Sequence, residues 1–222
     1  MQKPQIRNTA DGSDTLYVAA IDECYHSTNG AIQESLHIFI NDGFRECKNE
    51  RVKVLEIGFG TGLNAFLTLL ESEKTDKNVN YTGIELYPVD ISDALKLNYP
   101  ELTDKSKISE YQQIHQCAWN EAMQITEKFT LTKLLADFTE TPFEEKFDVI
   151  YFDAFSPEKQ PEMWSENLFK KLYLCAENDA ILTTYCAKGA VRRAMQAAGF
   201  TVERLPGPIG KREILRARKL KK

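Results

Sequence analysis

The stretch Val54-Leu55-Glu56-Ile57-Gly58-Phe59-Gly60-Thr61-Gly62 indicates the fold more strongly than any other part of this 222-residue chain. The apolar run Arg51–Ile57 predicts a buried strand, and Leu63–Glu71 follows it with the spacing of a helix. Glycines between the two let the backbone turn tightly and approach a ligand with no Cβ in between. A strand, a glycine turn and a helix in this order predict a ligand-binding loop, with an ordinary tight turn as the alternative.

The spacing of the glycines narrows the class of ligand. Gly58, Gly60 and Gly62 form G-x-G-x-G, whereas a dinucleotide fingerprint has its third glycine one position later, where this chain has Leu63. Glu56, the acid before the first glycine, suits a ligand with a cationic amino group. The stretch resembles motif I of the class I S-adenosylmethionine-dependent methyltransferases, whose donor carries such a group on its methionyl end.

Strands and helices alternate outward from this loop, which predicts a doubly wound α/β fold. Two successive strands at the C-terminus predict an antiparallel pairing at one edge, as in the seven-stranded, mostly parallel sheet of class I methyltransferases. We expect this Rossmann-like domain over residues 51–222 and a short N-terminal extension over residues 1–50. The expected strands are Thr15–Ala20, Arg51–Ile57, Asn80–Glu85, Phe129–Ala136, Phe147–Phe152, Ala180–Tyr185, Phe200–Arg204 and Glu213–Ala217, and the expected helices are Ala31–Phe44, Leu63–Glu71, Pro88–Tyr99, Glu110–Lys128, Asn167–Ala176 and Gly189–Ala198.

Three acids lie at the ends of predicted strands, the edge where ligands bind in such sheets. Glu85 is placed to accept hydrogen bonds from two ribose hydroxyls, and Asp137 to bind an adenine amino group beside Phe138. Asp153 follows the apolar run Val149–Phe152, where a carboxylate without a partner is costly to desolvate. We therefore predict a catalytic role for Asp153, with Phe155 as a stacking partner for a flat substrate. The alternatives are an exposed strand-end acid for Glu85, a turn-forming aspartate for Asp137 and core packing for Phe155.

The composition argues against a membrane-spanning, disulfide-stabilised or metal-binding protein. Hydrophobic residues make up 42% of the chain and charged residues 27%, an ordinary balance for a folded soluble domain. No apolar run approaches the ~20 residues of a membrane span, and no apolar signal core follows the polar N-terminus, so we expect a cytoplasmic protein. The five cysteines and three histidines show neither disulfide nor metal-ligand spacing, so no metal is expected.

The net charge of −5 argues against nucleic acid, but basic residues gather near the C-terminus. Lys211 and Arg212 open a strongly basic run that ends at Lys222, and Arg192 and Arg193 precede it. Such a local patch can bind phosphates even on an acidic protein. A frayed, solvated tail is the alternative.

The segment after Asp153 resembles one family closely. Asp153-Ala154-Phe155-Ser156-Pro157-x-Lys159-x-Pro161-x-Met163-Trp164 is similar to the signature of the tRNA 5-methylaminomethyl-2-thiouridine methyltransferases, which comprise MnmD and the methyltransferase half of MnmC. Gly58–Asn64, Tyr25–His37 and Val191–Glu213 resemble the same family.

The resemblance implies a substrate and a donor. It implies methyl transfer from S-adenosylmethionine to the 5-aminomethyl nitrogen of the wobble uridine, 5-aminomethyl-2-thiouridine, in the anticodon loop of tRNA. It implies that Asn64 belongs to the donor-binding loop. The family's FAD-binding oxidoreductase half is a separate domain that we do not expect in this chain. For the tRNA, the candidate contacts are Lys159, Trp164, Arg192, Arg193, Lys211 and Arg212.

Other functions share parts of this pattern. Another class I methyltransferase, or an aminopropyltransferase of the spermidine synthase type acting on a small amine, would have the same fold. A nicotinamide-dependent oxidoreductase or a non-catalytic RNA-binding module fits less well. The sequence leaves open which tRNAs are modified, whether 2-thiolation is required and how many chains associate. It also leaves open whether Asp153 is a general base or only orients the amine and the donor, and whether the N-terminal section covers the donor or braces the sheet.

Overall fold

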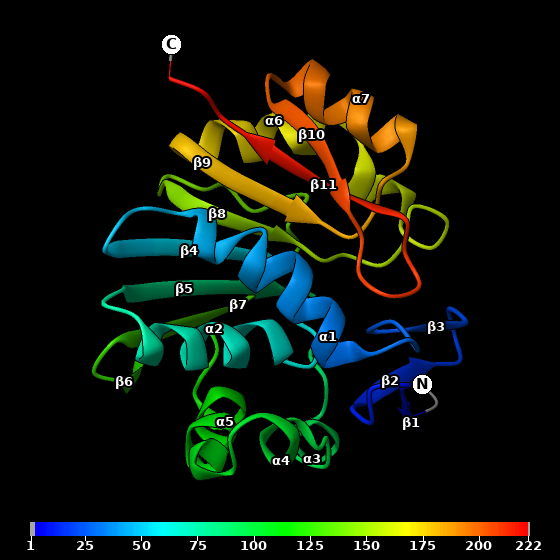
Figure 1. The fold of residues 1–222 in the computed structure, drawn as a ribbon, viewed down its shortest axis with the longest axis vertical. Coiled ribbons are helices and arrows are strands. Elements are labelled where there is room, and N and C mark those ends of the chain that lie inside the picture. The colour runs from blue at the N-terminus through cyan, green and yellow to red at the C-terminus, as the bar shows by residue number, and fades with distance from the viewer. Residues whose placement is uncertain (1–2, 222) are drawn as a thin grey trace.

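The computed structural model describes residues 3–221 and has a mixed sheet at its centre with helices on both faces (Figure 1). In spatial order the eight strands of this sheet are β10 (Thr201–Pro206), β11 (Glu213–Arg218), β9 (Ala176–Thr184), β8 (Phe147–Phe152), β4 (Arg51–Ile57), β5 (Asn78–Glu85), β7 (Phe129–Leu135) and β6 (Ala122–Thr126). The central strands are parallel: β4 pairs with both β5 and β8, while β7 and β9 continue the sheet on either side.

The C-terminal edge confirms the predicted antiparallel pairing. Strand β11 lies between β9 and β10 and runs antiparallel to both. A doubly wound, mostly parallel sheet with a reversed strand at this position is the fold predicted from the glycine loop and the strand order.

The opposite edge corrects the sequence prediction, because the sheet has eight strands and not seven. The expected helix Glu110–Lys128 ends early as α5 (Ile108–Gln116), and its second half becomes β6, which pairs antiparallel with β7. Asn120, with a left-handed φ of 64°, turns the chain between the two. An edge strand this exposed carries no continuous apolar run, so hydrophobic periodicity could not distinguish it from a helix.

Helices cover the two faces of the sheet, and each face has its own apolar core. Side chains along β4 point to alternate faces of the sheet, so Val52 and Val54 belong to one core and Leu55 and Ile57 to the other. The first face carries α2 (Leu63–Lys74) and α5; the second carries α6 (Glu166–Cys175) and α7 (Gly189–Ala198) (Figure 1). Between β5 and α5 the predicted helix Pro88–Tyr99 is instead two short helices, α3 (Ile91–Ala94) and α4 (Tyr99–Thr103), followed by the 3₁₀ turn η3 (Lys105–Lys107).

The N-terminal section adds a small sheet and a helix that packs on the main body. Its three antiparallel strands are β1 (Gln5–Asn8), β2 (Asp14–Val18) and β3 (Glu23–Cys24). The predicted helix Ala31–Phe44 is α1 (Ala31–Ser35), continued by the π-helical η1 (Leu36–Asn41) and the 3₁₀ turn η2 (Phe44–Glu46). The division of the chain at residue 50 stays a prediction, and residues 1, 2 and 222 at its two ends lie outside the described ones. No helix among residues 3–221 is long and apolar enough to cross a membrane.

Candidate active site

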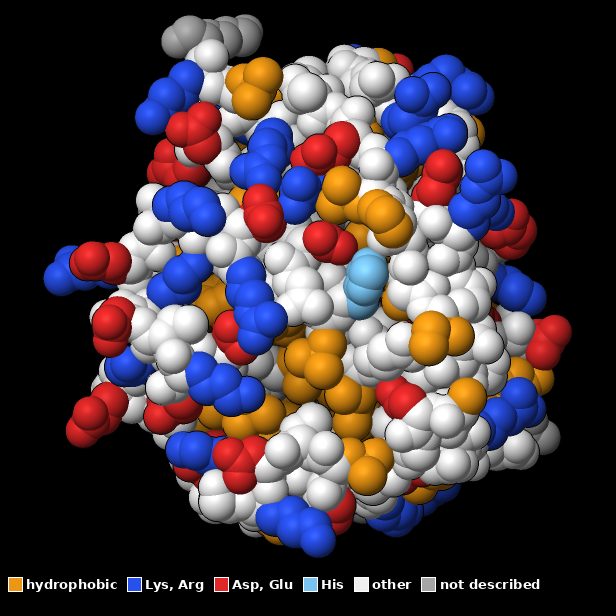
Figure 2. Space-filling model, viewed as in Figure 1, with side chains coloured by type: hydrophobic (Ala, Val, Ile, Leu, Met, Phe, Trp, Pro, Cys, Tyr) orange, Lys and Arg blue, Asp and Glu red, His pale blue; other side chains and the backbone are white. Residues whose placement is uncertain are grey.

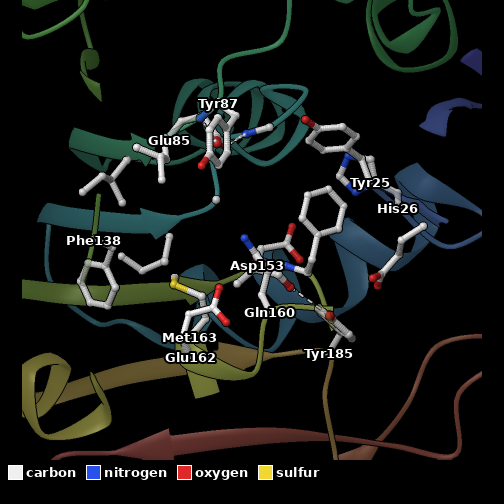
Figure 3. Close-up of a pocket in the computed structure, with 18 of the residues that line it drawn as sticks. Tyr25, His26, Glu85, Tyr87, Phe138, Asp153, Gln160, Glu162, Met163 and Tyr185 are labelled. Carbon is white, nitrogen blue, oxygen red and sulfur yellow. Dashed lines mark hydrogen bonds between the residues drawn. The ribbon is translucent and has the colours of Figure 1, made fainter. Parts of the chain in front are cut away.

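A cavity of about 840 Å³ opens where the parallel strands end (Figure 3). Gly58 and Gly60 follow β4, Glu85 ends β5, Asp137 follows β7 and Asp153 follows β8, and all five residues line it. The structure therefore brings together the strand-end acids and the glycine loop. They occupy the edge of the sheet at which open α/β folds bind their ligands.

The glycine loop needs glycine for reasons visible in its surroundings. Gly58 has a φ of 88°, and a Cβ there would lie 2.6 Å from the carbonyl oxygen of Asp153. Gly60 has a φ of 48°, and a Cβ there would lie 2.8 Å from the ring of Tyr25. A side chain at either position would strain the backbone, and it would press on the end of β8 at Gly58 and on the ring of Tyr25 at Gly60. The loop thus presents bare backbone to the cavity.

Glu85 and Asp137 bind backbone N–H groups on the cavity wall. The carboxylate of Glu85 accepts hydrogen bonds from the backbone N–H of Gly60, at 3.0 Å, and of Tyr87, at 2.9 Å. Burial raises the pKa of Glu85 above its usual range. Asp137 Oδ1 accepts from the backbone N–H and the hydroxyl of Thr139, both at 2.7 Å, so Asp137 forms a turn while it also lines the cavity.

Asp153 has the electrostatic setting of a proton acceptor. Its Oδ2 accepts a hydrogen bond of 2.8 Å from the Asn64 amide. Burial, followed by the negative charge of Glu34, outweighs that bond and the positive charge of Lys211, and raises the pKa of Asp153 to about 7. A carboxyl with this pKa exchanges protons readily near neutral pH, as a general base requires.

Glu56, Asn64 and Gly62 are not among the residues that line the cavity, and their contact with the donor stays a prediction. Glu56 is fully buried, and its Oε1 accepts from the same Asn64 amide that binds Asp153, at 2.8 Å. The alternation of β4 turns Glu56 toward α2 and away from the strand end. Gly62 begins α2 and faces His115. Through Asn64, Glu56 is linked to Asp153 and not to the cavity itself.

Phe155 lines the cavity beside the N-terminal section. Its ring meets that of Tyr25 edge to face, with 5.1 Å between the centroids, and its backbone N–H donates to Gln160 Oε1 at 3.1 Å. The ring is therefore held at the cavity surface, where a flat substrate can stack on it.

Trp164 is placed differently from its prediction as a stacking partner. Its side chain is only 7% exposed and packs against the rings of Phe152 and Tyr185. Its indole N–H donates to the carbonyl of Phe155 at 2.8 Å. Burial removes the free ring face that a base would need, so Trp164 supports the Phe155 loop from behind.

This position predicts an effect on stability. We expect Trp164→Phe to lower the free energy of unfolding by roughly 1–2 kcal/mol, since it removes one buried hydrogen bond and some packing. Thermal unfolding measures this change, and donor binding by calorimetry should stay within about twofold. An unchanged melting temperature with tRNA binding weakened tenfold would restore the stacking role.

The N-terminal section supplies cavity residues that the strand-end pattern could not reveal. Tyr25 lies over Gly60, and His26 is buried with its Nε2 2.7 Å from the Thr61 hydroxyl. Burial lowers the pKa of His26 to about 4, so this histidine is neutral at physiological pH. The section therefore forms a wall of the cavity, as Figure 3 shows for Tyr25 and His26, and the only sequence signal for this was the family resemblance.

The predicted basic residues separate into two groups. Lys211 lines the cavity, whereas Lys159, Arg193 and Arg212 are exposed and Arg192 is partly buried, and the contact of these residues with tRNA stays a prediction. The C-terminal run is an ordered strand up to Arg218, with Arg216 bound to Glu203 at 2.6 Å and Arg218 to Glu46 at 2.8 Å. Basic and acidic side chains adjoin across this face (Figure 2), so the part of the run from Glu213 to Arg218 is neither a frayed tail nor a free cationic patch.

The lining of the cavity carries an excess of acid. A cavity of this charge favours cationic ligands, such as a sulfonium or an ammonium. The carboxylates are Asp22, Glu23, Glu34, Glu85, Asp137, Asp153 and Glu162, against the basic Lys211. Within residues 3–221 no cluster of three histidine, cysteine or acidic side chains is arranged to hold a metal ion.

Comparisons with known proteins define the class. The family of S-adenosyl-L-methionine-dependent methyltransferases matches residues 100–220, and the chain belongs to this family. It is 33% identical to the tRNA 5-methylaminomethyl-2-thiouridine biosynthesis bifunctional protein MnmC of Leptospira borgpetersenii, over 87% of this chain and 32% of that protein. The chain thus spans about a third of the length of the curated relatives it matches.

Solved structures agree with this class. The crystal structure of MNMC2 from Aquifex aeolicus has a TM-score of 0.76 and 26% identity, over 98% of this chain and 70% of that one. Spermidine synthase from Thermotoga maritima has a TM-score of 0.57 over 98% of this chain and 72% of that one, but at 14% identity it shares the fold alone. The matches to MnmC and to MNMC2 confirm the resemblance to the tRNA 5-methylaminomethyl-2-thiouridine methyltransferase family.

The residues present fit S-adenosylmethionine. The cavity has room for a ligand of this size, and Gly58 and Gly60 line it with backbone that carries no side chain. Glu85 at the end of β5 and Asp137 after β7 carry carboxylate oxygens that can accept hydrogen bonds from ribose hydroxyls and an adenine amino group, and the acidic lining suits a sulfonium.

Proposed function

We propose that this chain transfers a methyl group from S-adenosylmethionine to the 5-aminomethyl nitrogen of the wobble uridine of tRNA, giving 5-methylaminomethyl-2-thiouridine from the thiolated base. The observation that carries the proposal is Asp153, a half-buried carboxyl with a pKa of about 7 beside the glycine loop in an acidic cavity. The names of the MnmC relatives supply the identity of the substrate. The substrate implies a cytoplasmic protein, and only methyl transfer is assigned to these residues, with no role for FAD.

The chemistry requires a neutral amine. S-adenosylmethionine supplies a methyl group on a positively charged sulfur, which is open to in-line attack by a nitrogen lone pair. Asp153 accepts the proton that the acceptor ammonium must lose, which typically contributes ~10²–10⁴-fold. Holding donor and acceptor in line within the cavity can contribute roughly 7–11 kcal/mol in all, so positioning accelerates the reaction more than proton transfer does. Asn64 fixes the orientation of Asp153, with Glu56 holding Asn64 from the other side.

The donor's remaining contacts follow from the wall of the cavity. Glu85 accepts from ribose hydroxyls, and Asp137 binds the adenine amino group next to Phe138. The backbone of Gly58 and Gly60 lies against the donor, where no Cβ intervenes. The wobble base leaves the anticodon stack to enter, at a cost of a few kcal/mol that stacking on Phe155 offsets.

Phosphate binding falls to the exposed basic residues near the cavity: Lys159, Arg193, Arg212 and the partly buried Arg192. We expect Arg193→Gln with Arg212→Gln to weaken tRNA binding. The slope of log Kd against log salt should fall by about 0.7–0.9 for each phosphate that the protein no longer neutralises. The matched control is Lys48→Gln with Arg51→Gln, two exposed cations at the amino end of β4, away from the cavity. Equal slopes for both double variants would remove these arginines from the RNA-binding surface.

Aminopropyl transfer to a small polyamine is the second candidate, because the acidic lining also suits a polyamine cation. One experiment separates the two. The protein is incubated with methyl-labelled S-adenosylmethionine and tRNA lacking the methyl group, and the nucleosides are then analysed. Label in 5-methylaminomethyluridine or its 2-thio form supports the proposal. If the tRNA stays unlabelled while the protein converts decarboxylated donor and a polyamine, aminopropyl transfer is the function instead.

A further inference from the structure

A lysine of this chain already places an ammonium inside the cavity. Lys211, from the loop between β10 and β11, lies with its Nζ 2.9 Å from Glu34 Oε2 on α1. The same Nζ lies 4.9 Å from the centre of the Tyr185 ring. All three residues line the cavity together with Asp153.

The two groups that hold this ammonium are themselves fixed. Glu34 is only 9% exposed, and its Oε1 accepts from the backbone N–H of Ser27 at 3.2 Å. The Tyr185 hydroxyl donates to the carbonyl of Ala154 at 2.9 Å, which sets the ring beside the residue that follows Asp153. A buried carboxylate and the face of an aromatic ring are the two partners that proteins use to recognise an ammonium.

We propose that Glu34 and Tyr185 form the binding subsite for the acceptor's ammonium, and that Lys211 fills this subsite until the acceptor displaces it. The inference rests on the proposed function, because it takes the acceptor to be an amine. It assigns the class of ligand by its charge: a nucleoside with an aminomethyl group binds there, and one with a hydroxymethyl group does not.

Lys211 is suited to leave. Its side chain is 27% exposed and sits on a flexible four-carbon stem. When one ammonium replaces another, the Glu34 carboxylate stays paired throughout, so the exchange avoids the cost of a buried unpaired charge. The arriving ammonium then lies beside Asp153, the group that takes its proton.

Substitutions of Glu34 and Lys211 should change nucleoside affinity in opposite directions, and this difference tests the proposal. We expect Glu34→Gln to raise the Kd of 5-aminomethyluridine nucleoside about tenfold, and Lys211→Met to lower it severalfold because the competitor is gone. The nucleoside carries no phosphate, so weaker binding of the RNA backbone cannot produce either shift. Calorimetry with S-adenosylhomocysteine bound provides the measurement, and 5-hydroxymethyluridine is the neutral control ligand. Lys211→Arg, which keeps a cation, should resemble the wild type.

The outcomes separate this inference from the proposed function. If both Glu34→Gln and Lys211→Met raise the Kd, the ion pair only braces the cavity and the inference is wrong. The inference is also wrong if the aminomethyl and hydroxymethyl nucleosides bind with the same Kd. It is wrong as well if no saturable binding of either nucleoside is measured with the wild type or with Lys211→Met. The tRNA labelling experiment is independent of these results, so methylation of tRNA with a failed nucleoside test rejects the subsite alone. Unchanged S-adenosylhomocysteine affinity and melting temperature show that each variant is folded.

Discussion

Asp153→Asn is expected to slow methyl transfer by ~10²–10⁴-fold while donor affinity changes little. The substitution keeps the size of the side chain and an oxygen that can accept from Asn64, but it removes the carboxylate placed to take the acceptor's proton. Single-turnover rates with saturating donor and tRNA measure the chemical step directly. The matched control is Asp148→Asn on the same strand, β8, where the carboxylate binds Asn49 and the backbone of Lys53. Asp148→Asn should leave the rate unchanged, and wild-type speed in Asp153→Asn would show that the role is assigned to the wrong residue.

The pH dependence of the rate follows from the same group. Asp153 must be ionised to accept a proton, and burial raises its pKa to about 7, so the wild-type rate should fall as pH drops below about 7. Asp153→Asn should lack this acidic limb, and a wild-type profile that is flat from about pH 5 to pH 8 would contradict a base of this pKa. The pKa of His26, about 4, lies too low to supply the limb.

Glu85→Ala is expected to weaken S-adenosylmethionine binding by roughly 10²-fold. A hydrogen bond to a charged acceptor contributes about 1.5–3 kcal/mol, and Glu85 also ties the backbone of Gly60 to the end of β5. Removal of the carboxylate therefore deprives the ribose of its acceptor and loosens the glycine loop together. Calorimetry with S-adenosylhomocysteine gives the Kd, and Glu101→Ala on the exposed face of α4 serves as the control. A Kd within about threefold of the wild type would place the ribose elsewhere.

The carboxyl ends of the strands could be located well from the sequence, for a physical reason. Acids that directly follow apolar runs, as Asp137 and Asp153 do, stand where parallel strands end, and such ends share one edge. Glu56 shows the limit of this reasoning. It lies within β4 and not after it, so the two-residue period of a strand turns its side chain under α2.

Contacts between distant segments were beyond reach of the sequence. Tyr25 and Glu34 reach the cavity because the N-terminal section packs against the body, and nothing in their local pattern encodes that docking. Lys211 is one cation in a basic run along the chain, although its partner lies far away on α1. Strand β6 could not be predicted from the sequence because an exposed edge strand has little apolar periodicity.

The proposed function requires the methyl donor and the acceptor amine to meet beside Asp153 at the carboxyl edge of the sheet. A crystal structure of the protein with S-adenosylhomocysteine and 5-aminomethyluridine would show whether they do. We predict the sulfur over the loop Gly58–Gly60, the ribose on Glu85, and the aminomethyl nitrogen within hydrogen-bond distance of Asp153. A donor bound outside this cavity, or an acceptor nitrogen directed away from Asp153 with the sulfur out of line, would contradict the account.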